Sequence, residues 1–130
     1  MYKLLLAFFV TSYAASVCAQ EQDPIIGLWQ SPLDATGSYY TVNMIECGDN
    51  ICGVVQDVVN ASTRDASLVA GRMLIRNMAA YKNGRYRDGF IWNPEDKKNF
   101  KLRMSFRGER LLLESCDGAL CGGETWTRLQ

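Results

Sequence analysis

The chain contains no histidine among its 130 residues. This absence excludes the histidine general base, the Ser-His-Asp and Cys-His arrangements of hydrolases, and the imidazole ligands of many metal sites. The sequence also lacks a glycine-rich phosphate-binding loop and a Cys-x-x-Cys redox motif. We therefore expect no catalytic residues, no cofactor and no metal site, and we expect that the protein is not an enzyme.

An excess of charge is missing as well. Lys and Arg total 14 and Asp and Glu total 14, so nothing favours nucleic acid or anionic membrane as a partner. The adjacent acids Glu95 and Asp96 follow Asn93-Pro94, where turn residues point into solvent. This stretch offers fewer oxygen ligands than a calcium site requires. We interpret the acidic pair as a solvated turn.

Long apolar runs are also absent. The longest one, Leu4–Val10, is much shorter than the roughly 20 residues that span a bilayer. It follows Lys3 and precedes Val17-Cys18-Ala19, a pattern typical of a secretory signal peptide cleaved after a small residue. We predict a signal peptide over 1–19. A buried amino-terminal helix and a lipoprotein acylated on Cys18 are the alternatives.

The remaining segment, 20–130, is long enough for a single domain. It carries all 14 acidic residues and every basic residue except Lys3, so its net charge is about −1. The expected location is the periplasm or the medium. We find no linker and no internal repeat, and a small ligand or another envelope protein is the expected partner.

Four cysteines follow the predicted signal peptide: Cys47, Cys52, Cys116 and Cys121. An even number in an exported chain indicates disulfides, with three connectivities available. Turn-forming residues separate the members of each sequential pair, and a hairpin brings its flanking positions close together. We therefore predict the disulfides Cys47–Cys52 and Cys116–Cys121. A four-thiolate zinc site is the alternative, although its paired ligands usually have two residues between them.

The stretch 100–107 alternates strictly between apolar and polar residues. Its apolar members are Phe100, Leu102, Met104 and Phe106. Side chains of a strand point alternately to opposite faces, so this stretch predicts a strand with one buried face. Turn residues at 93–96 join it to the preceding stretch, in which Tyr86, Phe90 and Trp92 are expected to form a second buried face. Together these stretches predict an antiparallel hairpin over an apolar interior.

Similar patterns predict eight strands, over 25–29, 39–47, 51–59, 73–78, 85–92, 100–106, 110–115 and 122–129. Ser62-x-x-Asp65 resembles a capping box and predicts one short helix, over 64–70, within the 60–72 loop. Strands joined in order by tight turns favour an all-β, eight-stranded, antiparallel up-and-down barrel, because eight strands close well. An open sandwich is the structural alternative.

Four motifs occur in a characteristic order: 23–29 (DPIIGLW), 46–53 (ECGDNICG), 93–96 (NPED) and 125–128 (TWTR). Together they resemble the bacterial family called domain of unknown function 2147, over essentially the whole mature chain. The resemblance implies a small exported protein with a lipocalin-like barrel, and it implies no particular activity. Gly27-x-Trp29 and Arg128 are similar to the Gly-x-Trp and the late Arg of lipocalins. This similarity implies a structural role for Trp29 and Arg128, in which the Arg128 side chain packs over the face of the Trp29 ring at the closed end of the barrel.

Two functions follow from a barrel of this kind. The first is binding of a small apolar or amphipathic ligand, with Tyr86, Phe90, Trp92, Phe100, Leu102 and Met104 as the tentative contact residues. The second is a structural or interaction protein whose barrel is filled and whose surface docks onto another envelope component. A group of basic residues has two interpretations: an anion-binding site at the barrel mouth, or an ordinary solvated strand face. Its members are Arg72, Arg76, Lys82, Arg85 and Arg87.

Overall fold

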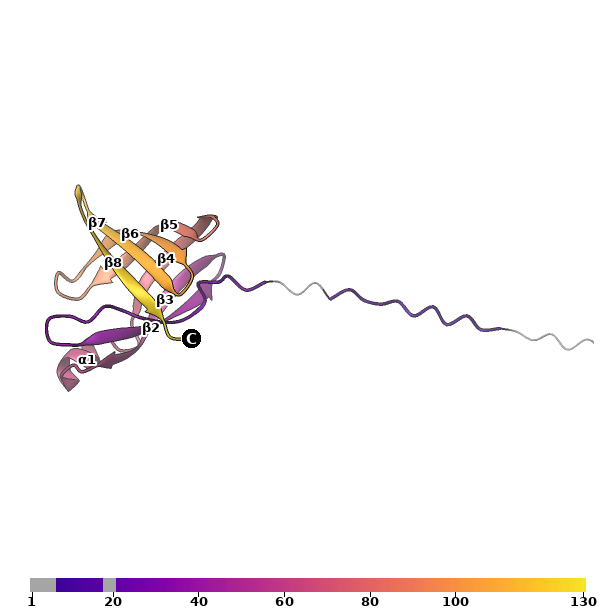
Figure 1. Ribbon diagram of the computed structural model, residues 1–130, viewed down its shortest axis with the longest axis horizontal. Helices are drawn as coiled ribbons and strands as arrows, with labels where there is room; N and C mark the ends of the chain where they lie inside the picture. The colour runs from indigo at the N-terminus through magenta and orange to yellow at the C-terminus, as the bar shows by residue number, and fades with distance from the viewer. Residues whose placement is uncertain (1–6, 18–20) are drawn as a thin grey trace, which may run out of the picture.

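The computed structural model describes residues 7–17 and 21–130, excluding the side chains of 63–65. Its elements are β1 (Gly27–Gln30), β2 (Tyr39–Cys47), β3 (Asn50–Val59), α1 (Thr63–Val69), β4 (Met73–Lys82), β5 (Arg85–Asn93), β6 (Lys98–Arg107), β7 (Arg110–Asp117) and β8 (Leu120–Arg128). Each strand pairs antiparallel with the next, and β1 also pairs with β8. The sheet is a closed eight-stranded barrel (Figure 1). The predicted up-and-down barrel is confirmed, and the open sandwich is wrong.

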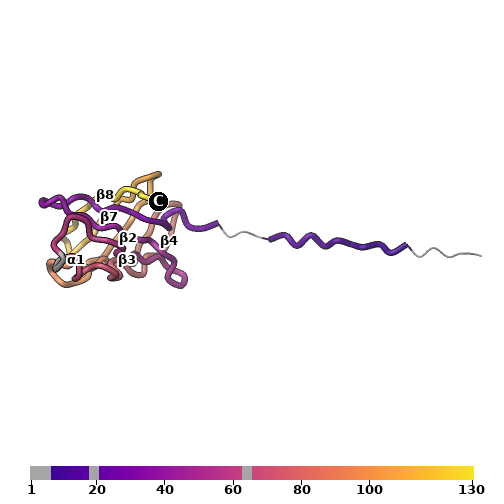
Figure 2. The backbone as a smooth tube through the Cα atoms, turned by 90° about the horizontal axis from the view of Figure 1, so that it is seen from below, coloured from indigo at the N-terminus to yellow at the C-terminus, as the bar shows by residue number. Residues whose placement is uncertain are grey.

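Antiparallel order divides the connections between the two ends of the barrel. The long β1–β2 loop, the segment that contains α1 and the β5–β6 turn lie at one end, which we call the mouth. The tips of β2–β3, β4–β5 and β6–β7 lie at the other end, which we call the closed end. In both overall views α1 is on the far side of the barrel from residues 7–17 (Figures 1 and 2). The amino-terminal residues therefore approach at the closed end.

The closed end is filled with large side chains. Trp29 and Ile25 are fully buried, and the Trp29 indole Nε1 donates a 2.8 Å hydrogen bond to the Ile25 carbonyl. The edge of the Phe106 ring meets Trp29 with centroids 5.9 Å apart. The first strand was predicted to begin at Ile25, but β1 begins at Gly27. The packing explains this difference, because the chain at 25–26 folds across the barrel end instead of joining the sheet.

The two cysteine hairpins differ in detail from the prediction. The structure has the predicted disulfides, Cys47–Cys52 and Cys116–Cys121. The turns are shorter, because Cys47 pairs with Asn50 and Asp117 pairs with Leu120, which leaves two residues in each turn instead of four. Glycine occupies the first turn position with a left-handed φ near 60° in both, as two-residue hairpin turns require. All four sulfurs are in disulfides, so they do not provide the thiolates of a zinc site.

A bulge in β5 changes which residues face inward. Tyr86 pairs with Met104, but the next inward pair is Gly89 with Leu102, so the bulge at 87–88 shifts the alternation. Asp88 there has a left-handed φ of 66°, which Asp tolerates better than most residues. Phe90 is consequently paired with Lys101 on the outer face and is 39% exposed. The prediction that Tyr86 and Phe90 share one buried face is wrong.

Residues 7–17 form no helix and are exposed, contrary to the alternative of a buried amino-terminal helix. Lys3 and the bond after Ala19, where cleavage is predicted, lie outside the described residues. Within the described part of the chain, no helix is both long and apolar enough to cross a membrane.

Candidate ligand cavity

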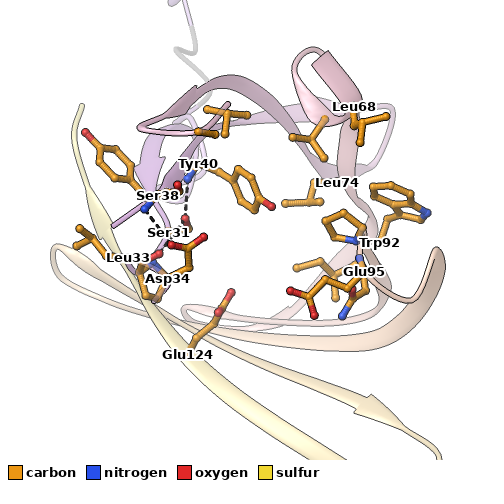
Figure 3. Close-up of a pocket in the computed structure, with 18 of the residues that line it drawn as sticks. Ser31, Leu33, Asp34, Ser38, Tyr40, Leu68, Leu74, Trp92, Glu95 and Glu124 are labelled. Carbon is orange, nitrogen blue, oxygen red and sulfur yellow. Dashed lines mark hydrogen bonds between the residues drawn. The ribbon is translucent and has the colours of Figure 1, made fainter. Parts of the chain in front are cut away.

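The mouth half of the barrel contains a cavity of about 840 Å³ that opens to solvent. Figure 3 shows it ringed by the β1–β2 loop, the segment around α1 and the β5–β6 turn. A volume of this size is within the range of about 300–1,000 Å³ that is usual for small-molecule sites. The mouth half is therefore open, while the closed half is packed.

The inner wall of the cavity is mainly apolar. It is lined by Tyr40, Val58, Leu74, Ile91, Phe100 and Trp126. Leu74 and Trp126 are almost fully buried; Leu74 is near the mouth end of β4, whereas Trp126 is toward the closed end of β8 and forms the floor of the cavity. Alternation along each strand brings these residues inward. The wall can contact an apolar body of a few hundred cubic ångströms.

The rim of the cavity is polar and bears carboxylates. Asp34 comes from the β1–β2 loop, Glu95 from the β5–β6 turn and Glu124 from β8. In Figure 3 the three side chains lie on different sides of the opening and point into it. No Lys or Arg is among the described residues that line the cavity.

Hydrogen bonds fix the position and charge of Asp34. Its Oδ1 accepts bonds from the Thr36 hydroxyl at 2.7 Å and from the Thr36 and Ser38 amides at 2.8 and 2.9 Å. These donors, the Thr36 hydroxyl first, lower the pKa of the Asp34 carboxyl below its usual value. Asp34 therefore stays ionised at neutral pH and holds its loop in a fixed shape.

Glu124 is oriented by the floor of the cavity. The Trp126 indole Nε1 donates a 2.8 Å hydrogen bond to Glu124 Oε1. Both residues are on β8, two positions apart, so both point into the barrel. The bond links an acidic group at the rim to an almost fully buried aromatic ring.

The tentative contact residues are distributed over three environments. Trp92 and Phe100 line the cavity. Tyr86, Leu102 and Met104 are buried in the core, below the lining. Phe90 lies on the outer face. The structure thus brings two of the six to the cavity and three to the core next to it.

The basic group does not form a cluster. Arg72 immediately precedes β4 near the mouth, where its guanidinium carbon lies 3.6 Å from the Trp92 ring centroid. Lys82 and Arg85 flank the β4–β5 tip at the closed end, and Arg87 stacks on Tyr81, 4.3 Å from that ring's centroid. These positions favour an ordinary solvated face over an anion-binding site.

Sequence reasoning missed the three rim carboxylates as a group and missed the floor residue Trp126. Asp34-x-Thr36-Gly37 is a recognisable turn, and Glu124-x-Trp126 alternates as a strand does. These signals indicate local structure only. Their convergence depends on the closure of the barrel.

Arg128 has the position that the resemblance implies. Its guanidinium carbon is 4.3 Å from the Trp29 ring centroid. The guanidinium also donates to the backbone carbonyls of Pro24 and, at 3.3 Å, of Ile26. A cation–π contact of this kind stabilises the fold by about 0.5–2 kcal/mol. Arg128 thereby fixes the segment that crosses the closed end.

A closed antiparallel barrel, an arginine stacked on the tryptophan of the first strand, and a cavity at one end define a lipocalin-like protein. The structure is similar to one described as "Protein HP1028 from the human pathogen Helicobacter pylori belongs to the lipocalin family". The TM-score is 0.67 and the identity is 16%, over 84% of this chain and 85% of the other. At this identity the likeness shows the fold alone.

The sequence also matches a family model over residues 27–128, described as "Uncharacterized protein conserved in bacteria (DUF2147)". The chain belongs to this family. No curated protein matches it.

Proposed function

We propose that this protein binds a small apolar or amphipathic molecule inside the mouth half of its barrel, and that it does so after export from the bacterial cytoplasm. The observation that carries the proposal is the 840 Å³ cavity with an apolar wall and a polar rim. The lipocalin-like fold and the two disulfides are compatible with this function. We further propose that the protein performs no catalysis.

The distribution of burial supports a carrier more than a filled interaction protein. A barrel that serves only as a scaffold gains stability from filling its interior, because each buried methylene contributes about 0.8 kcal/mol. The closed half follows this rule, with Tyr86, Leu102 and Met104 all buried. The mouth half keeps an open space instead.

The test is binding of the neutral fluorescent probe N-phenyl-1-naphthylamine to the mature protein. Val58 lines the cavity, so V58W should fill part of it and reduce the affinity for the probe at least tenfold. V54W is the matched control, since Val54 pairs with Asn43 on the outer face, and it should bind as the unmodified protein does.

Three results would contradict the proposal: no enhancement of probe fluorescence by the unmodified protein, equal affinity of V58W, or equal loss in both variants. Native mass spectrometry of protein purified gently from an exporting host would add the identity of a retained ligand. We expect a mass of a few hundred daltons that is lost on denaturation.

A further inference from the structure

Among the described residues that line the cavity, every charged side chain of the polar rim is acidic. The three described lining side chains that carry charge at neutral pH are the carboxylates of Asp34, Glu95 and Glu124, and they approach the opening from three separate segments (Figure 3). The whole chain, in contrast, has equal numbers of acidic and basic residues. The negative charge at the mouth is thus a local property.

Nearby cations do not neutralise this rim. Lys98 begins β6 beside the mouth, but its ammonium is 2.6 Å from the Asp117 carboxylate. Among the described residues, Arg72 and Lys97 are the other cations at this end: the Arg72 guanidinium carbon lies 3.6 Å from the Trp92 ring centroid, and Lys97 is in the same β5–β6 turn as Glu95 and Asp96. Together with Asp96 and Asp117, the described carboxylates at this end number five and still outnumber these three cations.

Below the carboxylates the wall is apolar and aromatic, through Phe100 and Trp126. Aromatic faces attract cations as well as apolar groups. Glu124, held by the Trp126 indole at 2.8 Å, therefore lies where the apolar wall meets the rim. A ligand with its apolar part in the cavity would have its polar end beside this carboxylate.

We propose that the cavity selects amphipathic molecules whose polar end is cationic, such as alkyl amines or quaternary ammonium compounds. This inference rests on the proposed function and names the ligand class for the same site. The apolar part packs on the cavity wall, and the cation sits among Asp34, Glu95 and Glu124. An anionic head group would meet three like charges in the same place.

The test compares three ligands with the same twelve-carbon chain: dodecyltrimethylammonium, dodecanol and dodecyl sulfate. Each competes with N-phenyl-1-naphthylamine for the mature protein, below its micellar concentration and at low salt. Each exposed charge changes affinity by roughly threefold at a separation of about 6 Å in water. We therefore expect dodecyltrimethylammonium to bind at least tenfold more tightly than dodecyl sulfate, with dodecanol between them.

The preference for dodecyltrimethylammonium over the neutral dodecanol should fall about threefold in each of the variants E95Q and E124Q, and about tenfold in the double variant. E109Q is the matched control: it removes the same charge from the β6–β7 turn at the closed end, where Glu109 is exposed, and it should leave the preference unchanged. Raising the salt concentration should also reduce the preference, because exposed charges are screened.

Equal or tighter binding of dodecyl sulfate would overturn the inference, as would an unchanged preference in the double variant. Dodecanol and the neutral probe would still bind in those cases, so the proposed carrier function would stand. If neither the probe nor any of the three ligands binds, both proposals are wrong.

Discussion

The two ends of this barrel are built from the same strands and have opposite character. At the closed end, Trp29 and Ile25 are fully buried, and Arg128 ties the crossing segment to the sheet. At the mouth, long connections surround an open cavity with a charged rim. The comparison shows a division of roles. The packed closed half stabilises the fold, so the mouth half can keep an open cavity without having to stabilise the fold as well. Three predictions can break or sharpen this division.

The largest expected effect concerns the tryptophans of the two ends. W29A removes a fully buried side chain together with its contacts to Arg128 and Phe106, and should lower the free energy of unfolding by about 4 kcal/mol. W92A removes a partly buried ring at the mouth and should cost only about 1 kcal/mol. Urea unfolding of the two variants beside the unmodified protein measures both values. Similar losses at the two ends would refute the division.

The second prediction concerns Tyr86, whose hydroxyl donates a hydrogen bond to the Asp23 carboxylate at the closed end. Y86F should lower the free energy of unfolding by about 2 kcal/mol at pH 7, because a hydrogen bond to a charged group is lost.

Burial, followed by the bond to Asp23, raises the pKa of Tyr86 well above its usual value. The folded state therefore keeps this proton at a pH where the unfolded state loses it. The stabilisation is complete below about pH 10 and decreases as the pH rises further. The difference between Y86F and the unmodified protein should thus shrink from pH 7 to pH 11. If the difference in unfolding free energy between Y86F and the unmodified protein did not change with pH, the raised pKa of Tyr86 would be contradicted.

The smallest expected effect is at the mouth. D34N weakens the acceptor that holds the Thr36 and Ser38 amides. Hydrogen exchange of these two amides should accelerate several-fold, while the global free energy of unfolding stays within about 0.5 kcal/mol.

Because the pKa of the Asp34 carboxyl is lowered in the folded protein, its contribution is present near neutral pH and is lost as the pH falls through that lowered value. The difference in exchange between D34N and the unmodified protein should narrow at low pH. A large global loss in D34N would mean that the mouth loop also supports the fold.

Much of the barrel could be predicted because its signals are local. The alternation of 100–107 and the turn residues between strands depend on near neighbours in the chain, and the short loops that follow from them specify the order of the strands. The disulfide partners were predicted for the same reason, since each pair flanks one hairpin.

The wrong predictions concern features that the local sequence pattern does not determine. The bulge at 87–88 moves Phe90 outward without any break in the apolar pattern around it. The rim could not be predicted either, because Asp34, Glu95 and Glu124 are far apart in the sequence and meet only after the sheet closes. Whether a barrel interior is filled or open depends on side-chain volumes in several strands at once.

The position of the chain ends has a practical consequence. The Leu28 amide donates to the Gln130 carbonyl at 2.9 Å, and the Leu129 amide donates back to the Leu28 carbonyl at 2.8 Å. These bonds place the last residue at the closed end, opposite the cavity, and the bond from Tyr86 places Asp23 there as well. An affinity tag, a surface linkage or a fused reporter at either terminus would hold the molecule with its opening facing outward. Immobilised protein should accordingly keep full access for ligands, which makes surface-based binding assays suitable for the comparisons above.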